Sequence, residues 1–573
     1  MGIKSRRRNT HSGPAPVRVG SPTCRSRQAS GSVASNQFHD LGLSIDGRRA
    51  VGGDDESASR LSEVLSNEDV EIPDDDTIQL EPIDPSLRSF VKSQLIFSRV
   101  MLIFFQFCFN YVMHDWPTDA FKGMPIVAEP TRRDRLIEST IGGLANWDAR
   151  HFLHIAEFGY TWESELAFFP LYPTILRLLG SIVEPILEPI SLRNAMVLAG
   201  VAVSNVAFVA AGLVLFELTY RLTANLKIAL IASYVFCWNP ASVFFSAAYT
   251  ESIYCLISFS GMLYLEVDPY NRLRQLVTAC IFSFGFATRS NGVLNLGYIG
   301  YYLLIEVIMV KQEDGKYVFD DFGIKTFTNG LKKLPFFLLC VLIVILPLRI
   351  FSTAIEDKFC HSASALFSDP RVAEYVATHN ASAFTLPGQL DRLPWCDRAA
   401  NGVIDPLFPP YYQAVQEKYW SVGLFGYWQI RKIPFFFVAA PTIFIVFYGL
   451  IDLILETGTI EESLETQIRS KRLLVPYALH ALVLTLAGIL TYNVEVSIRM
   501  LYSSTPFICI VLARHMARQT PRIRVPEDLL DPFVLPFLSN YARVKASRFL
   551  IVTYLLGYFT IGTMMHVNWL PFV

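Results

Sequence analysis

Long runs of apolar residues recur along most of this 573-residue chain, beginning near residue 89. A helix needs about 20 predominantly apolar residues to cross the hydrocarbon core of a bilayer. Further apolar stretches at 166–190 and 250–310 are broken by Pro, Gly and charged residues. The pattern predicts an all-α, polytopic transmembrane protein with about 11 spans. The clear runs are 90–113, 195–220, 228–248, 335–352, 434–454, 473–492, 500–514 and 548–567.

The composition agrees with this class. Hydrophobic residues make up 52% of the chain and charged residues only 17%, whereas a soluble domain carries about 25% charged residues. The net charge of −2 gives no basis for a nucleic-acid partner. The nine cysteines are scattered and form no Cys-x-x-Cys pair, so we expect no zinc site.

The first 87 residues differ from the rest. Residues 1–39 contain seven Lys or Arg and no acid, and residues 54–84 contain twelve Asp or Glu and one Arg. Such a segment cannot bury a hydrophobic core, and it lacks the apolar stretch of a signal peptide. We predict a disordered cytosolic tail over 1–87 and a membrane domain over 88–573.

Basic residues indicate which connections face the cytosol. By the positive-inside rule, Lys and Arg accumulate in cytosolic loops. Loops 114–165 and 353–433 are then expected on the opposite side of the membrane. The basic clusters that support this orientation lie at 311–333, 469–472 and 514–524.

Two features of loop 353–433 indicate that the opposite side is the lumen of the endoplasmic reticulum. Asn380, Ala381 and Ser382 form an N-glycosylation acceptor motif. Cys360 and Cys396 are the only cysteines in this loop, and an oxidising lumen would let them form a disulfide. Two unpaired thiols are the alternative.

The polar segment 146–160 carries the most informative chemistry. We expect Asn146 to cap a short helix and Gly159 to end it. Asp148 would lie in the first turn, where the helix dipole favours the ionised carboxylate, as a general base requires. Trp147 would offer a flat apolar face to a sugar. The alternative is an interfacial amphipathic helix with polar residues in the headgroups.

Further acids and histidines follow in the same region. His151, His154 and Glu157 recur every three residues, which is only a weak pattern for a divalent metal. Glu163 and Glu165 precede an apolar run, and either is a candidate second acid or a membrane-surface anchor. We include both histidines and both of these glutamates among the candidate substrate-binding residues.

Three more candidates interrupt apolar stretches. Glu251 either orients substrate or begins a helix as an acid in its first turn. Arg289, with Asn291 close by, has no acid beside it in the sequence, and an arginine at membrane depth needs a partner. A phosphate is one partner that suits its fork of donors. A snorkelling position, or an ion pair with Glu251 or Asp148, is the alternative.

One polar interruption suggests no function from the sequence. Ser503, Ser504, Thr505 and Pro506 form a polar kink in a span beside Arg499. We predict no role for this segment.

Taken together, these motifs resemble the PIG-V mannosyltransferase family, which acts in GPI-anchor assembly. The likeness spans about 88–573, and the N-terminal tail departs from the family pattern. It rests on these segments in family order: Trp147–Tyr160, Ala167–Pro170, Pro240–Glu251, Arg289–Gly292, Pro394–Cys396, Tyr419–Gly423, Ala439–Pro441, Ser503–Pro506 and Gly557–Phe559.

The resemblance implies a multispanning glycosyltransferase of the GT-C type in the endoplasmic reticulum membrane, with a lumenal active site. Such an enzyme takes mannose from dolichyl-phosphate-mannose and adds it, α1,6-linked and with inversion, as the second mannose of the GPI precursor. Trp147 and Asp148 match the Trp-Asp pair of the family and are the catalytic candidates. No cofactor or metal is implied, and a small membrane accessory subunit is possible because fungal relatives work with one.

Two other functions are consistent with the residues. One is a transferase that uses the same donor on another acceptor. The other is a lipid or solute transporter, which would not need the Asp148 carboxylate.

Overall fold

The computed structural model describes residues 82–571, apart from several internal segments. All of the described residues belong to the compact unit Asp54–Val573. The predicted tail, up to residue 81, and the glycosylation motif at Asn380 lie outside the described residues. The internal segments left out are 119, 125–129, 312–316, 320–322, 362–368, 380–383, 401–407, 457–472 and 520–545.

The structure confirms the polytopic helical class. Among the described residues, five helices are long and apolar enough to cross a membrane, and a helix pair bent by 78° makes a possible sixth span. The predicted number of 11 spans stays a prediction. The five helices are α2 (Pro85–Val112), α6 (Leu192–Thr223), α11 (Ile324–Cys360), α15 (Ile433–Glu456) and α21 (Ala546–Val567), and the bent pair is α18 (Ser497–Ser504) with α19 (Phe507–Gln519).

Shorter helices pack around these. Helix α6 packs against α5, α7 and α8, and α9 packs against both α8 and α11. The only strands described, β1 (Met309–Lys311) and β2 (Tyr317–Phe319), form an antiparallel hairpin. The shorter helices of this part are α5 (Leu171–Ile186), α7 (Leu226–Cys237), α8 (Glu251–Glu266), α9 (Arg272–Thr288), α10 (Leu296–Ile308) and α17 (Val475–Leu490).

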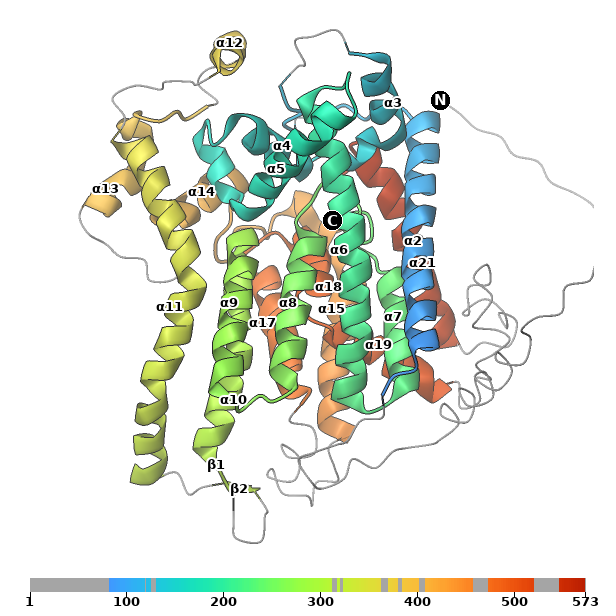
Figure 1. Ribbon diagram of the computed structural model, residues 1–573, viewed down its shortest axis with the longest axis vertical. Coiled ribbons are helices and arrows are strands. Elements are labelled where there is room, and N and C mark those ends of the chain that lie inside the picture. The colour runs from blue at the N-terminus through green and yellow to red at the C-terminus, as the bar shows by residue number, and fades with distance from the viewer. Residues whose placement is uncertain are drawn as a thin grey trace, which may run out of the picture. The chain divides into compact units, whose positions relative to one another are not determined.

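The two loops predicted to face the lumen lie side by side (Figure 1). The indole N–H of Trp395 donates to the Glu163 carboxylate at 3.0 Å, which joins loop 353–433 to loop 114–165. The β1–β2 hairpin lies at the opposite end of the helices (Figure 1). This arrangement agrees with the two loops sharing one side of the membrane. Their helices are α3 (Arg132–Ile141), α4 (Asp148–Phe158), α12 (Pro370–Thr378), α13 (Pro394–Ala400) and α14 (Pro410–Trp420).

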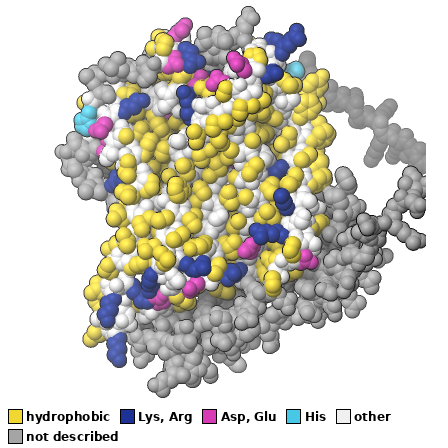
Figure 2. Space-filling model, viewed as in Figure 1, with side chains coloured by type: hydrophobic (Ala, Val, Ile, Leu, Met, Phe, Trp, Pro, Cys, Tyr) yellow, Lys and Arg dark blue, Asp and Glu magenta, His cyan; other side chains and the backbone are white. Residues whose placement is uncertain are grey.

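The surface has the distribution of side chains that a bilayer requires. In the face that Figure 2 shows, hydrophobic side chains fill a broad band between charged groups at its two ends. Large apolar side chains on α11 and α15, among them Leu338, Leu342, Phe437 and Phe444, are exposed. Lipid tails satisfy such side chains, whereas water would penalise them.

The apolar run 228–248 is not one transmembrane helix, and that prediction is wrong. Helix α7 ends at Cys237, and a buried non-helical segment continues to Thr250. Asn239 forms the turn: its side chain donates to the Phe236 carbonyl at 2.8 Å and accepts from the Ala241 N–H at 2.9 Å. Pro240 then removes a backbone donor that a continued helix needs.

Arg99 of α2 holds this segment in place. Its guanidinium donates to the carbonyls of Cys237 at 2.9 Å and Ser242 at 3.1 Å, and to the hydroxyls of Ser242 and Ser246 at 3.2 Å each. Irregular backbone inside a membrane is tolerated where protein groups satisfy its polar atoms. Arg99 therefore fixes the segment that leads to Tyr249 and Glu251.

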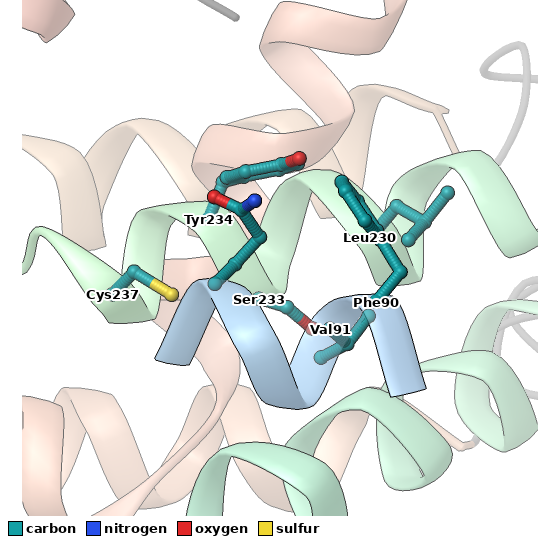
Figure 3. A pocket seen from close by; sticks show the side chains of 7 residues that line it. Phe90, Val91, Leu230, Ser233, Tyr234 and Cys237 are labelled. Atoms are coloured by element: carbon teal, nitrogen blue, oxygen red, sulfur yellow. The ribbon is translucent and has the colours of Figure 1, made fainter. Parts of the chain in front are cut away.

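A small pocket lies between α2 and α7 (Figure 3). Its lining is mostly apolar and includes Phe90 and Val91 of α2 with Leu230, Tyr234 and Cys237 of α7. None of the charged site residues predicted from the sequence lines it.

Candidate active site

The turn that begins α4 has an unusual backbone. Trp147 precedes the helix at φ 59° and ψ −127°, and no side chain caps the helix. The prediction that Asn146 caps it is wrong: its side-chain oxygen accepts from the Arg150 guanidinium at 3.3 Å, and its amide donates to the Val567 carbonyl at 2.7 Å. The prediction for Gly159 is confirmed: it ends the helix at φ 75°, and its N–H bonds the Ile155 carbonyl at 2.8 Å. A non-glycine residue at positive φ is costly and persists only where the surrounding structure holds it.

Asp148 is the first residue of α4 and is held at two points. Its backbone N–H donates to the Tyr249 hydroxyl at 3.0 Å, and that hydroxyl donates to the Asn146 carbonyl at 3.3 Å. Its Oδ2 atom accepts a hydrogen bond from Arg499 at 2.8 Å. The Asp148 side chain remains 34% exposed, so a substrate hydroxyl has access to it.

The pKa of Asp148 lies below its ordinary value. Burial acts to raise it, but the charge of Arg499 and its hydrogen bond, with smaller contributions from His151 and Arg289, outweigh that effect. The carboxylate is therefore ionised at neutral pH, in the form that a general base needs.

Glu251 connects two arginines. It begins α8 and is fully buried, and its carboxylate forms an ion pair with Arg289. The same oxygen lies 3.6 Å from Nη1 of Arg499. Two carboxylates and two guanidinium groups thus form a continuous network, which we call the charge network. Its members are Asp148, Arg499, Glu251 and Arg289.

The ion pair answers the question that the sequence left open for Arg289. Its partner is Glu251, and it also donates to the Thr250 hydroxyl at 3.1 Å. Its guanidinium further donates to the Asn291 side chain at 3.3 Å. A phosphate would therefore add to an existing ion pair, and binding of the donor by Arg289 stays a prediction.

Asn291 lies at the edge of the charge network. Its side-chain amide donates to the Ser504 hydroxyl at 2.7 Å and to the Tyr254 hydroxyl at 3.1 Å. The polar kink at Ser503–Pro506 thus supplies a partner to a candidate site residue. The absence of a functional role for the kink stays a prediction.

The end of α21 supports the same turn from the other side. The Trp147 indole donates to the His566 carbonyl at 3.2 Å, and its ring lies 5.5 Å from that of Trp569. The His566 ring lies 5.5 Å from the Tyr249 ring. Segments separated by most of the chain therefore converge on Asp148.

His151 lies beside Asp148 on α4. Its ring stacks on Phe168 at 4.7 Å and lies 4.8 Å from Phe121. Burial lowers the pKa of His151 to about 4, although the charge of Asp148 opposes this shift. His151 is therefore neutral near neutral pH, beside Asp148.

His154 and Glu165 pair with each other. Nε2 of His154 lies 3.0 Å from Oε1 of Glu165 and 2.9 Å from the Thr161 hydroxyl. Burial raises the pKa of Glu165 to about 8, although hydrogen bonds from Thr161 and Trp162 oppose the shift. Burial also puts the pKa of His154 well below its ordinary value. Near neutral pH the pair is therefore a carboxylic acid against a neutral imidazole.

Glu163 is buried and surrounded by protein donors. Its carboxylate accepts hydrogen bonds from Trp395 at 3.0 Å and Tyr419 at 2.9 Å, and it pairs with Lys418. These contacts belong to the joint between the two loops, and none involves Asp148 or its partners. Direct contact of Glu163 or Glu165 with substrate stays a prediction.

The weak metal pattern does not assemble. His151 stacks between phenylalanines, His154 pairs with Glu165, and Glu157 forms an ion pair with Arg193 at 2.9 Å. Within the described part of the chain, no three His, Cys, Asp or Glu side chains are grouped as a metal site would require. The expectation that the reaction needs no metal is not tested by this.

Cys360 and Cys396 are joined by a disulfide, with their Cα atoms 5.6 Å apart. The bond ties the end of α11 to α13. Both cysteines contact the apolar cluster that contains Tyr160, Leu166 and Trp395. The disulfide thus belongs to the scaffold on which the two loops meet.

Sequence reasoning missed Arg499 as a member of the site. Helical spacing would offer Glu495, four residues earlier, as its partner, but that carboxylate accepts from the Tyr427 hydroxyl at 2.6 Å. The available signal was a single arginine at the start of an apolar run. The sequence alone does not reveal that this arginine meets an acid 351 residues away.

Among solved structures, the chain is similar to the oligosaccharyltransferase of Archaeoglobus fulgidus. The match has a TM-score of 0.38 and 9% identity, and it covers 83% of this chain and 56% of that one. The chain thus spans little more than half of that structure, and a likeness this weak supports no conclusion.

Curated relatives are much closer in sequence. GPI alpha-1,6-mannosyltransferase 2 of Rattus norvegicus is 29% identical, covering 85% of this chain and 99% of the relative. The human protein of the same name is 28% identical, covering 86% and 99%. GPI mannosyltransferase 2 of Drosophila pseudoobscura is 31% identical, covering 71% and 87%. The family model described as mannosyltransferase (PIG-V) matches residues 89–573, and this chain therefore belongs to the PIG-V mannosyltransferase family.

Proposed function

We propose that this enzyme adds the second mannose, in α1,6 linkage, to the GPI precursor. The relatives named GPI alpha-1,6-mannosyltransferase 2 support the acceptor and the linkage, because the match extends over nearly their whole length. The donor is dolichyl-phosphate-mannose, as the family resemblance implies. The reaction takes place at the lumenal face of the endoplasmic reticulum membrane.

The observation that carries the chemistry is the state of Asp148. It is an ionised, partly exposed carboxylate at the start of α4, fixed by Tyr249 and Arg499. The two other candidate acids of the same loop, Glu163 and Glu165, are buried among protein groups. Asp148 is therefore the base that a substrate hydroxyl can reach.

The reaction is a single displacement. The 6-hydroxyl of the acceptor mannose attacks the anomeric carbon of the donor while Asp148 takes the hydroxyl proton. A new carbon–oxygen bond forms, the bond from the anomeric carbon to the phosphate oxygen breaks, and dolichyl phosphate leaves with the electron pair. One inversion converts a β-linked donor into an α-linked product.

The charge that develops on the leaving phosphate needs positive groups nearby. Arg289 is the candidate ligand, because its guanidinium is partly exposed beside Thr250 and Asn291. Glu251 and Asn291 orient this arginine. Trp147 shapes the turn that presents Asp148, and His151 lines the same side of α4.

The lumenal assignment rests on charge. Basic residues, typical of cytosolic loops, cluster at 311–333, 469–472 and 514–524. One of the two loops that build the site carries a disulfide, which persists in an oxidising compartment. A small membrane accessory subunit remains an expectation from the family.

The test is a complementation assay in cells that lack the endogenous enzyme. The full chain should restore GPI-anchored proteins at the cell surface, and the cells without it should accumulate a GPI intermediate with a single mannose. Accumulation of an intermediate with several mannoses would contradict the second-mannose assignment. Tags in loops 114–165 and 353–433 that are accessible from the cytosol would contradict the lumenal site.

A further inference from the structure

The two oxygens of the Asp148 carboxylate have different surroundings. Oδ2 accepts from Arg499 at 2.8 Å, whereas Oδ1 has no hydrogen bond to any described residue. The backbone N–H of the same residue is fixed by Tyr249. Because Oδ2 and the backbone N–H are both held, the direction in which Oδ1 points is defined.

Arg499 is itself tightly held. It lies on α18, just before the bend of 78° to α19. Its guanidinium carbon lies 5.1 Å from the centre of the Phe244 ring and 5.7 Å from that of Tyr249. Cation–π contacts of this kind favour a desolvated guanidinium. Phe244 and Tyr249 come from the segment that Arg99 anchors, so the position of Arg499 is set by the scaffold.

No other cation among the described residues donates a hydrogen bond to the Asp148 carboxylate. The remaining groups whose charges act at the carboxylate are His151 on α4 and Arg289 at the end of α9. His566 on α21 lies near Tyr249, and Glu251 on α8 is a second acid that pairs with both arginines. Arg289 pairs with Glu251, and among the described residues neither histidine forms a hydrogen bond with the carboxylate. Arg499 is therefore the one cation among the described residues with a direct hydrogen bond to the base.

From this geometry we propose that Arg499 is a positioning residue for the transfer reaction, and the inference rests on the proposed function. It holds Oδ2, keeps the carboxylate ionised, and leaves Oδ1 to accept the proton of the acceptor hydroxyl. When the proton has moved to Oδ1, Glu251 remains the ionised acid beside Arg499. The arginine acts through Asp148 and does not itself touch the reacting atoms.

The pH dependence of catalysis provides a readout that a purely structural role would not change. Burial raises the pKa of Asp148, and the charge of Arg499 is the main influence that lowers it. Without that charge the pKa of Asp148 should rise. A general base works only when deprotonated, and its active fraction falls about tenfold for each pH unit below its pKa. The acidic limb of the kcat profile should therefore move to higher pH.

The experiment compares Arg499→Gln, Arg499→Lys and Arg193→Gln in microsomes that contain the full chain, with dolichyl-phosphate-mannose and a one-mannose GPI precursor. Arg193 is a matched control, since it pairs with Glu157 at the other end of α4 at 2.9 Å. We expect kcat of Arg499→Gln to fall at least tenfold at pH 6.5 and to recover much of this loss at pH 8.5. Arg499→Lys should shift the limb less, because it keeps the charge but loses the fork.

Activities are normalised to the amount of protein. An unchanged acidic limb in Arg499→Gln, or a loss that is equal at every pH, would overturn the proposal. If the Arg499→Gln protein does not accumulate, Arg499→Lys is used to decide. An acidic limb and a kcat equal to those of the wild-type enzyme would then contradict the proposal. Failure of the wild-type enzyme to make any mannosylated product is a different outcome, and it would refute the proposed function itself.

Discussion

The indole nitrogen of Trp147 donates a hydrogen bond to the His566 carbonyl at 3.2 Å, across 419 residues of sequence. The turn that presents Asp148, the proposed base, is thereby held by α21. The positive φ of Trp147 persists because this bond and the neighbouring bond from Asn146 to Val567 fix it from outside.

Substituting Trp147 tests this link. Trp147→Phe keeps an aromatic ring but leaves the His566 carbonyl without its donor, which costs about 1–3 kcal/mol for a buried polar group. We expect kcat/KM to fall about tenfold, because a small displacement of a reacting group is expensive in rate. Trp428→Phe is the control, since that exposed indole donates to the Ile489 carbonyl at 2.7 Å away from the site. Equal losses in both variants would contradict a role in presenting Asp148.

Asp148→Asn keeps the shape of the side chain and removes the proposed base. General-base catalysis is typically worth about 10²–10⁴-fold, so we expect kcat to fall by that factor while donor binding is retained. Asp148→Glu should recover little, because a shift of about 1 Å can cost 10²-fold. Restoration of surface GPI-anchored proteins by Asp148→Asn would show that the base lies elsewhere.

Glu165→Gln should be tolerated near neutral pH. Burial raises the pKa of Glu165 to about 8 in the folded protein, so its protonated form resembles Gln. Because the folded pKa exceeds the unfolded one, the stability this group contributes is fully present below about pH 4.5 and is lost as the pH rises through about 8. Thermal unfolding of wild type should therefore occur at lower temperature at pH 8.5 than at pH 7.

His154 does not add to this dependence of stability on pH, because above its ordinary pKa it is neutral in both the folded and the unfolded protein. Glu165→Gln should flatten this dependence on pH. Glu163→Gln is the comparison, because it breaks the ion pair with Lys418 and should lower stability at both pH values. Selective loss of kcat in the Glu163 variant, with normal abundance, would instead indicate a catalytic acid.

Arg289→Lys tests whether Arg289 binds the phosphate of the donor. Lysine keeps the charge but loses the second donor that contacts Asn291, and it cannot present a bidentate fork. The KM for dolichyl-phosphate-mannose should rise more than the KM for the acceptor, and Arg289→Ala should raise it further. Arg272→Lys, whose guanidinium pairs with Glu306, is the control. A wild-type donor KM in both Arg289 variants would exclude phosphate binding by this residue.

The Cys360–Cys396 bond should stabilise the loop that it closes. The cysteines are 36 residues apart, and closure of such a loop is worth about 4 kcal/mol in the chain-entropy model. Cys360→Ser and Cys396→Ser should each lower the unfolding temperature, and the double substitution should add little to either. Peptide mapping without reductant that finds both thiols free would contradict the bond in the mature protein.

The sequence by itself determined the class of the protein and most of the elements that carry its chemistry. Apolar runs of about 20 residues have one stable environment, and α2, α6, α11, α15 and α21 follow from them. The short helix at Asp148 and its end at Gly159 also follow, because a glycine past a helix favours positive φ on local grounds. The motifs around Asp148 and Arg289 were sufficient to indicate the family.

Only the tertiary structure decided which charges meet. The Asp148 carboxylate bonds an arginine 351 residues away, and the partners of the Glu163 carboxylate lie 232 or more residues away. Apolar periodicity carries no information about such pairs. The break after Cys237 was also missed, because its buried segment is as apolar as a helix. Asn239 and Pro240 end the helix locally. Arg99 on another helix then satisfies backbone carbonyls that a membrane would otherwise leave unpaired.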